Sequence, residues 1–243
     1  MPAYCEEQNI ERCLQSIRRQ TFEKGKIETI VVDSNSPDNT RAIAKKYADK
    51  VVNLKARGVS KARNLGAQKA TGRLLLFVDA DTVLDQKFVA EIHEALNNSD
   101  IVYVVGTMAG LEWSGTASNL FKFLHYGLVN LISTLTAHLG FPFFPTVCCA
   151  CKKTAFDRVG GFDEGLAIAE DLTFSLKMGK TGKCLVSKKA KAYTSLRRIR
   201  KNGVLKNYYM YLSNYFKVFV LNKKPWITDF PHPSEIQDRE PIF

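Results

Sequence analysis

Two carboxylates one residue apart follow a short apolar run in the first third of the chain. Leu74 to Val78 is preceded by Gly72 and followed by Asp79 and Asp81, a pattern typical of a strand covered on both faces. Side chains alternate along extended chain, so both acids should point the same way, with backbones about 6 to 7 Å apart. One acid would then bind Mg²⁺ or Mn²⁺ and the other a nearby hydroxyl. A solvated acidic turn is the alternative interpretation.

Charge is distributed unevenly along the chain. The 243 residues contain 35 Lys+Arg and 24 Asp+Glu, for a net charge of +11. Residues 172–224 hold 14 Lys or Arg and no acid, so the rest of the chain sums to −3. This local basicity indicates an anionic partner at one face. Length and composition are those of one globular domain with a full core.

Cysteines and apolar runs predict a cytoplasmic protein. The six cysteines show no paired framework, and the C-x-x-C of Cys148 and Cys151 has no second pair. Buried free thiols in a reducing compartment are therefore favoured over a zinc site. The polar start of the sequence predicts no signal peptide, and no run of 18 apolar residues is present.

Strands and helices are expected to alternate over the first 80 residues. We predict strands at 27–32, 50–54 and 74–78, separated by helices. Such alternation produces right-handed crossovers and a parallel sheet, whose ligands bind beyond the carboxyl ends of the strands. Asp33 and Asp79 occupy two such ends. The later elements are predicted as a helix at 86–96, a strand at 101–107, a helix at 119–139, a strand at 146–151, a helical turn at 154–159, a helix at 170–179, a basic loop at 193–201 and a terminal helix at 202–221.

One predicted helix carries a leucine stripe on a face without charge. Its leucines recur at steps of three and four residues, so the stripe should form one side of a helix. Burial of the stripe against the domain is favoured, and contact with a membrane or a membrane partner is the alternative. The stripe consists of Leu120, Leu124, Leu128, Leu131, Leu135 and Leu139.

Five motifs follow one another between residues 2 and 182. They are Pro2-Ala3-Tyr4-Cys5-Glu6-Glu7, residues 30–36 with Asp38 and Thr40, Ala62-Arg63-Asn64 with Gly66, Asp79-Ala80-Asp81, and Gly160-Gly161-Phe162-Asp163-Glu164 with Glu170-Asp171. In order and spacing this set resembles the family 2 glycosyltransferases, which have the GT-A fold. The resemblance implies an α/β domain with a mixed, mostly parallel sheet flanked by helices.

The resemblance also implies inverting transfer of a sugar from a nucleotide-sugar donor, with Mg²⁺ or Mn²⁺ as cofactor. It places Asp171 as catalytic base, Glu170 beside it, Asp33 on the base of the nucleotide, Pro2, Ala3, Tyr4 and Glu6 or Glu7 near the nucleoside, Arg63 near base or phosphates, Asp79 at the ribose and beside the metal, and Asp81 on the metal. The cation would stabilise the departing diphosphate, and the base would accept the proton of an acceptor hydroxyl. An acceptor phosphate needs no deprotonation. For Asp171 the alternative is a helix-start acid that binds backbone amides.

The sequence departs from the family pattern at three places. Cys5 stands where the family has Asn, and Thr173 stands where many members have a third acid. The Q-x-x-R-W signature of processive synthases is absent, which favours transfer of a single sugar. An apolar first strand before Pro2 is also missing, and two neighbouring strands would lose hydrogen bonds without it. We expect that the sequence begins inside a longer protein or that another segment fills this slot.

The basic segment near the end of the chain is the predicted acceptor site. Arg197, Arg198, Arg200 and Lys201 precede an aromatic helix. Arginine clusters bind phosphate, and a cationic aromatic helix suits an anionic membrane surface. We expect a polyprenyl phosphate or another lipid-linked or glycan acceptor, met by an enzyme peripheral to the inner face of the cell membrane. A solvated basic face is the alternative.

The predicted domain spans residues 1–224, with a nucleotide-sugar half at 1–110 and an acceptor half at 111–224. Residues 225–243 are predicted to form an extended tail after this domain.

Two other classes of function stay open. A basic surface with tyrosines is typical of nucleic-acid binding, although the clustered acids would repel nucleic acid, so no such partner is predicted. A catalytically silent scaffold with the same fold is the other alternative.

Overall fold

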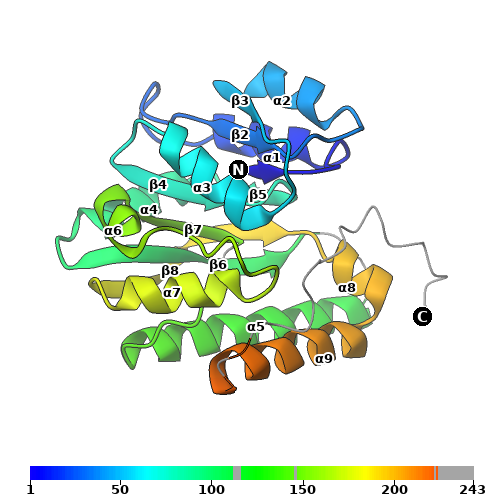
Figure 1. Cartoon of the computed structure of the whole chain (residues 1–243), viewed down its shortest axis with the longest axis vertical. Coiled ribbons are helices and arrows are strands. Elements are labelled where there is room, and N and C mark those ends of the chain that lie inside the picture. Colours follow the sequence, from blue (N-terminus) through cyan, green and yellow to red (C-terminus); the bar gives the residue numbers. More distant parts are fainter. Residues whose placement is uncertain (112–115, 145–146, 222, 224–243) are drawn as a thin grey trace.

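Two β-sheets form the centre of the molecule. The computed structural model describes residues 1–111, 116–144, 147–221 and 223. Within them, the strand orders are β1-β2-β3 in one sheet and β4-β7-β6-β8-β5 in the other. Figure 1 shows the smaller sheet towards one end of the molecule and helices α5 and α9 at the opposite end.

The smaller sheet is parallel and is built from strand-helix units, as the alternation of elements predicted for the strands at 27–32 and 50–54. The strand at 74–78, expected in the same parallel sheet, instead pairs antiparallel with residues 148–152 in the other sheet. Its middle strand ends at Asp33, so this acid lies at the carboxyl edge of the sheet. The strands are β1 (Pro2–Ala3), β2 (Ile30–Asp33) and β3 (Lys50–Asn53), and the accompanying helices are α1 (Ile10–Arg18), α2 (Thr40–Tyr47) and α3 (Val59–Lys69).

The slot expected to lack a strand is partly filled by the first residues of the chain. Pro2 pairs with Val32 and Ala3 with Asp33, in parallel. The Val32 N–H also donates to the Met1 carbonyl at 2.9 Å. Within the described residues no ladder joins this sheet to β4, so the two sheets stay separate.

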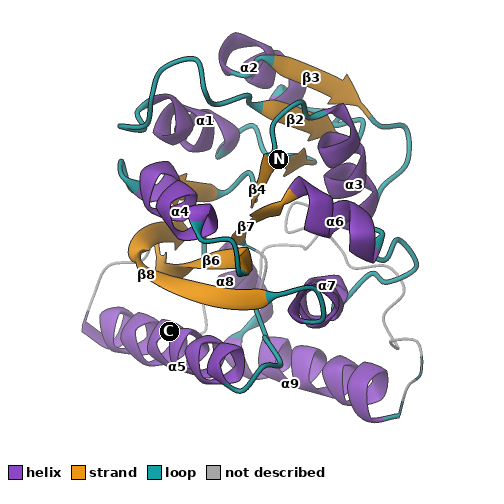
Figure 2. Cartoon of the chain, turned by 90° about the vertical axis from the view of Figure 1, so that its left-hand side faces the viewer, coloured by secondary structure: helices purple, strands orange, loops and turns teal. Residues whose placement is uncertain are grey.

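The larger sheet is mixed. Strands β6 and β8 pair in parallel, whereas β4–β7, β6–β7 and β5–β8 are antiparallel. Figure 2 shows α1 and α4 on one side of the sheets and α3, α6 and α7 on the other. The strands are β4 (Leu74–Val78), β5 (Thr82–Leu84), β6 (Ile101–Gly110), β7 (Cys148–Lys152) and β8 (Lys183–Thr194), and the helices are α4 (Phe88–Asn97), α6 (Lys153–Val159) and α7 (Glu170–Gly179).

Strand β8 was not predicted, although it is 12 residues long and pairs along β6. Its lysines resemble loop composition, but they lie on the exposed positions while Val186, Ala190 and Ala192 are buried. The predicted basic loop at 193–201 is therefore wrong, because its first residues close β8 and the rest form α8 (Arg197–Asn202). The short strand β5 was also not predicted.

Helix α5 (Thr116–His138) confirms the predicted long helix but not the burial of its leucine stripe. The face turned towards the sheet carries Tyr126 and Ser133 instead, which are 7% and 4% exposed. The side-chain amide of Asn130 also makes two 3.1 Å hydrogen bonds to the backbone of Met108. The leucines of the stripe whose side chains are described are exposed, namely Leu124, Leu128, Leu131, Leu135 and Leu139.

The last described elements are α8, α9 (Val204–Tyr215) and a π-helical turn, η1 (Phe216–Val220). The predicted terminal helix is thus present but begins after Gly203, whose φ of 80° separates α8 from α9. The predicted tail at 225–243 lies outside the described residues.

Candidate active site

The D-x-D motif forms a tight turn between β4 and β5. The Thr82 N–H donates to the Asp79 carbonyl at 3.0 Å. Ala80 is buried, whereas the side chains of Asp79 and Asp81 are 31% and 17% exposed. The two acids are therefore presented at the surface with Ala80 turned inward, by a turn rather than by the extended chain that the sequence suggested.

Arg63 of α3 holds two of the predicted site acids together. Its guanidinium donates to Asp79 at 2.8 Å and to Glu170 at 3.1 Å, and its side chain is only 3% exposed. It also lies 5.2 Å from the centroid of the Phe162 ring. Burial alone would lower the pKa of Arg63, but the nearby carboxylates of Asp79 and Glu170 outweigh that effect and raise the pKa above its ordinary value. Burial raises the pKa of Glu170, while Arg63 opposes that rise.

Small residues bring α3 close enough to β2 to place Arg63. Ala62 is 1% exposed and packs in one cluster with Val32. A Cβ added at Gly66 would lie 3.4 Å from the Val32 side chain. The A-R-N-x-G motif therefore serves packing at Ala62 and Gly66 and charge at Arg63.

Asn64 fastens α3 to the G-G-F-D-E loop. Its side-chain amide donates to the Phe162 carbonyl and accepts from the Phe162 N–H, both at 2.9 Å. Phe162 in turn stacks on Phe174 of α7 at 4.1 Å between ring centroids. This contact fixes α7, and with it Glu170 and Asp171, relative to α3.

Arg197 of α8 joins two further acids from distant segments. Its guanidinium contacts Glu6 and lies 3.3 Å from Asp81. Glu6 is 6% exposed and also accepts a 2.9 Å hydrogen bond from Asn9. The predicted phosphate-binding arginine thus lies at the D-x-D turn. The side chains of Arg198 and Arg200 lie outside the described residues, and Lys201 of α8 is half-buried.

Asp33 is fully buried and organises the turn after β2. Its carboxylate accepts hydrogen bonds from the N–H and the hydroxyl of Ser36. The Ser36 hydroxyl also accepts from the Cys5 N–H at 3.1 Å. Asp33 is therefore linked to the same N-terminal segment that supplies Glu6, and its contact with a nucleotide base stays a prediction.

Asp171 lies in the first turn of α7. The helix begins after Ala169, which has a left-handed φ of 66°. One carboxylate oxygen of Asp171 accepts from the Leu172 N–H at 2.8 Å, as the alternative interpretation of a helix-start acid expects. Its neighbour in the chain, Glu170, shares Arg63 with Asp79 of the D-x-D turn, whereas the role of Asp171 as a base stays a prediction.

The structure separates Glu6 from Glu7. Glu7 is exposed and accepts hydrogen bonds from the N–H and side chain of Asn39, at 3.1 and 3.2 Å. It thereby stabilises the start of α2, and only Glu6 reaches the Arg197 contact.

Arg57 was not predicted as a site residue. It stacks on the Tyr4 ring at 4.3 Å and donates to the Tyr4 hydroxyl. A signal was present, because Arg57 lies in the loop after the carboxyl end of β3, where ligands of parallel sheets bind.

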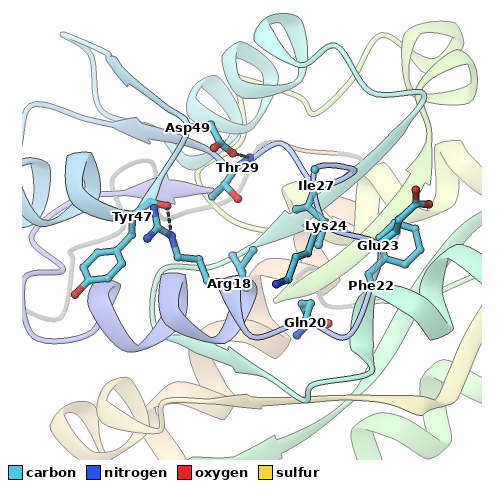
Figure 3. Close-up of a pocket in the computed structure, with 11 residues that line it drawn as sticks. Arg18, Gln20, Phe22, Glu23, Lys24, Ile27, Thr29, Tyr47 and Asp49 are labelled. Atoms are coloured by element: carbon cyan, nitrogen blue, oxygen red, sulfur yellow. Dashed lines mark hydrogen bonds between the residues drawn. The ribbon is translucent and has the colours of Figure 1, made fainter.

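A small groove elsewhere in the molecule contains none of these residues (Figure 3). It has a volume of about 170 Å³ and is lined by residues such as Arg18, Thr29, Tyr47 and Asp49. Thr29 precedes β2, so the groove lies at the opposite end of this strand from Asp33. Arg18 closes one side by donating to the Tyr47 carbonyl at 3.0 Å. This groove is smaller than typical ligand pockets.

The motif order and this geometry agree with a comparison to known families. The model of glycosyl transferase family 2 matches residues 1–160. The chain belongs to glycosyltransferase family 2. The resemblance of the five motifs to this family is thereby confirmed.

Curated relatives include proteins of cell-surface polymer synthesis. The chain is 30% identical to the minor teichoic acid biosynthesis protein GgaB of Bacillus subtilis over 84% of its length, which is 23% of GgaB. It is 29% identical to the poly(ribitol-phosphate) β-N-acetylglucosaminyltransferase TarS of Staphylococcus aureus over 73% of its length, which is 31% of TarS. The chain therefore spans less than a third of either relative.

Similarity to solved glycosyltransferase structures shows that this chain has the GT-A fold. A mannosyltransferase from Pyrobaculum calidifontis, in complex with GDP-Man and Mn²⁺, has a TM-score of 0.70 at 20% identity, covering 96% of this chain and 65% of that one. S. aureus TarS residues 1–349 in complex with UDP-GlcNAc has a TM-score of 0.63 at 25% identity, covering 80% and 56%. The predicted fold class is confirmed.

Proposed function

We propose that this family 2 chain transfers one sugar, with inversion, from a nucleotide-sugar to a lipid-linked acceptor. The observation that carries the proposal is the pair of arginine bridges at one edge of the sheets. Arg63 joins Asp79 to Glu170, and Arg197 joins Asp81 to Glu6. Segments up to 191 residues apart in sequence thus meet at the D-x-D turn.

The D-x-D turn has the oxygen ligands that a hard divalent cation prefers. Asp81 is the better candidate ligand for Mg²⁺ or Mn²⁺, with Asp79 beside it, because Asp79 is committed to the buried Arg63. Among the described residues, no three His, Cys, Asp or Glu side chains are arranged so that together they could hold a metal ion. Two carboxylates fit a cation whose other ligands are diphosphate and water. Such a cation would stabilise the negative charge of the departing nucleoside diphosphate.

Nucleoside binding, orientation of the donor and proton transfer are assigned to different residues of the chain. Tyr4 with Arg57, and the Asp33 turn, would bind the nucleoside, and Arg63 would orient Asp79 towards the ribose. The acceptor oxygen attacks the anomeric carbon as the bond from that carbon to the diphosphate oxygen breaks. Asp171 would accept the proton of an acceptor hydroxyl, whereas it would only position an acceptor phosphate, whose ionised oxygen can attack without deprotonation.

The acceptor side of the proposal rests on basicity next to the D-x-D turn. The segment from Arg197 to Lys201 leads from Asp81 directly towards α9. A polyprenyl phosphate is an acceptor whose charge matches this segment. We accordingly place the enzyme at the inner face of the cell membrane as a peripheral protein. No helix in the described residues is long and apolar enough to cross a bilayer.

Donor turnover tests the proposal. With Mn²⁺ and a panel of UDP- and GDP-sugars, the chain should release nucleoside diphosphate, and a bound donor should raise its melting temperature. Asp81→Ala and Asp171→Asn should each lower turnover by about 10²-fold to 10³-fold. The control is Glu94→Gln, an exposed acid of α4, which should retain full turnover.

Two results would contradict the proposal. If no nucleotide-sugar shifts the melting temperature or turns over, the silent-scaffold interpretation is favoured. If turnover is present but equal in Asp81→Ala and wild type, the D-x-D turn does not hold the metal.

A further inference from the structure

The exposed large apolar side chains of the described residues are concentrated on one part of the molecule. All of them lie between residues 123 and 141 or between residues 205 and 221. Isolated exposed leucines are ordinary on protein surfaces, but a contiguous set marks a contact site. The set consists of Phe123, Leu124, Leu128, Leu131, Ile132, Leu135, Leu139 and Phe141, followed by Leu205, Tyr209, Leu212, Phe216 and Leu221.

The polarity of α9 is inverted relative to that of a helix packed in water. Its inward side chains include Asn207 and Asn214, which are 2% and 1% exposed. Its outward side chains include Leu205, Tyr209 and Leu212, which are 85%, 76% and 64% exposed. A surface helix in water buries its apolar side and exposes its polar side. The outward face of α9 therefore fits an apolar environment.

Helix α5 shows the same inversion. Ser133 and Asn130 face the sheet, while Leu128 and Leu135 are 52% and 53% exposed. The inward polar groups are satisfied, since Ser133 donates to the Phe143 carbonyl at 3.2 Å. Helix α5 therefore packs through polar contacts on its inner side and leaves its leucines outward.

The two outward faces form one surface. Figures 1 and 2 show α5 and α9 side by side, at the end of the molecule away from α2. His125 of α5 hydrogen-bonds the Tyr208 hydroxyl, and Phe143 meets Tyr215 edge-on at 5.9 Å. We name the exposed apolar residues of both segments the α5–α9 platform.

The platform carries positive charge and no negative charge. Residues 116–141 and 204–223 contain no Asp or Glu. Lys206 and Lys223 are exposed at its α9 side. An apolar surface edged by lysines is complementary to the acyl chains and anionic headgroups of a bilayer. A second copy of the chain would instead bring like charges together.

We propose that the α5–α9 platform is a membrane-contact surface that rests in the headgroup region of an anionic bilayer. Lying in the plane of the interface suits helices too polar on their inner sides to cross it. The inference deepens the proposed function, on which its biological purpose rests, because it orients the acceptor side. Helix α8, which carries Arg197, joins the platform to the D-x-D turn, so a lipid-linked phosphate would arrive beside Asp81.

Vesicle flotation of the whole 243-residue chain tests the proposal. The chain should float with phosphatidylcholine–phosphatidylglycerol vesicles and much less with phosphatidylcholine alone. Replacing Leu128, Leu135, Leu205 and Leu212 by Gln should weaken binding at least tenfold. Lys206→Gln should weaken binding to the anionic vesicles about fivefold, whereas the matched control Lys26→Gln, on an exposed loop before β2, should not.

Other outcomes overturn the proposal in distinguishable ways. A chain that stays unbound with both kinds of vesicle has no such surface. A chain that is dimeric by light scattering, becomes monomeric in the four-leucine variant and ignores vesicles uses the platform for a second copy. The proposed function is assessed separately, because the Asp81→Ala variant should lose most of its donor turnover but should still float. The leucine variant should retain turnover with a water-soluble donor, which also shows that it is folded.

Discussion

The regions around Arg63 and Arg197 both contain an arginine that links two carboxylates, but the Arg63 side chain is more deeply buried than that of Arg197. Each arginine bridges two carboxylates, and each pair includes one acid of the D-x-D turn. The Arg63 side chain is 3% exposed, on a helix of 11 residues that is fastened to α7 through Asn64 and Phe162. The Arg197 side chain is 23% exposed, on a helix of six residues that ends at Gly203.

The comparison teaches that the two acids of one motif can have different freedom. Breaking a buried bridge leaves uncompensated charge, whereas a more exposed bridge can be replaced by solvent or another cation. Asp79 is thus fixed by Arg63, and we expect Asp81 to be able to exchange the more exposed Arg197 for a divalent ion. This supports the division of roles in which Asp79 binds donor and Asp81 binds metal.

Removing Arg63 should have the largest effect. In Arg63→Ala, Asp79 and Glu170 would lose the cation between them, which should lower the free energy of unfolding by about 3 kcal/mol. The melting temperature should then fall by about 6 to 12 °C in calorimetry. Arg63→Lys should recover only part of this loss, because one ammonium cannot match a guanidinium fork. A loss no larger than that of Arg73→Ala, at the exposed amino end of β4, would contradict a structural role.

A substitution at Gly161 tests whether the region around Arg63 is rigid. Its φ is +70°, and an added Cβ would lie 2.6 Å from Asn64 Oδ1. Gly161→Ala should therefore destabilise the chain by about 2 kcal/mol or more. The matched control is Gly160→Ala, with φ of +73° but nothing within 4 Å, for which about 1 kcal/mol is expected. Equal denaturation midpoints for both variants would show that the Asn64 contact is not constraining.

Removing Arg197 should change metal binding more than stability. Asp81 would no longer be paired with this cation, so Mn²⁺ should bind the chain about fivefold more tightly, which corresponds to about 1 kcal/mol. The measurement is Mn²⁺ titration followed by electron paramagnetic resonance, with Arg73→Ala as the control. Sugar transfer should nevertheless decrease if Arg197 also contacts acceptor phosphate. Unchanged Mn²⁺ affinity would mean that Arg197 and the metal do not compete.

The smallest effect is expected from Glu170→Gln and depends on pH. Burial raises the pKa of Glu170 in the folded chain above its ordinary 4.5. The fold therefore favours the protonated form, and wild-type stability from this group is present below about pH 4.5 and is lost as pH rises through the folded pKa. The variant, which stays neutral, should therefore lose less melting temperature than wild type as the pH rises from 4 to 7. A difference independent of pH would contradict this assignment.

Several features were predictable because they depend on local sequence. The strand-helix alternation over β2, α2, β3 and α3 follows from apolar runs and turn residues. The position of Asp33 at a strand end follows from the same pattern. Strand β8 was not predicted because its lysines are equally typical of a loop. The segment is a strand because it pairs with β6, a contact that its own sequence does not reveal.

The sequence by itself determined the family, the order of the motifs and the residue types of the site, since these depend on identity and spacing alone. Only the tertiary structure decided which acid pairs with which arginine, and which side of α5 faces outward. A stripe of leucines has the same periodicity whether it faces a core or a membrane. The choice depends on what the opposite side of the helix contacts, and that is a property of packing between distant segments.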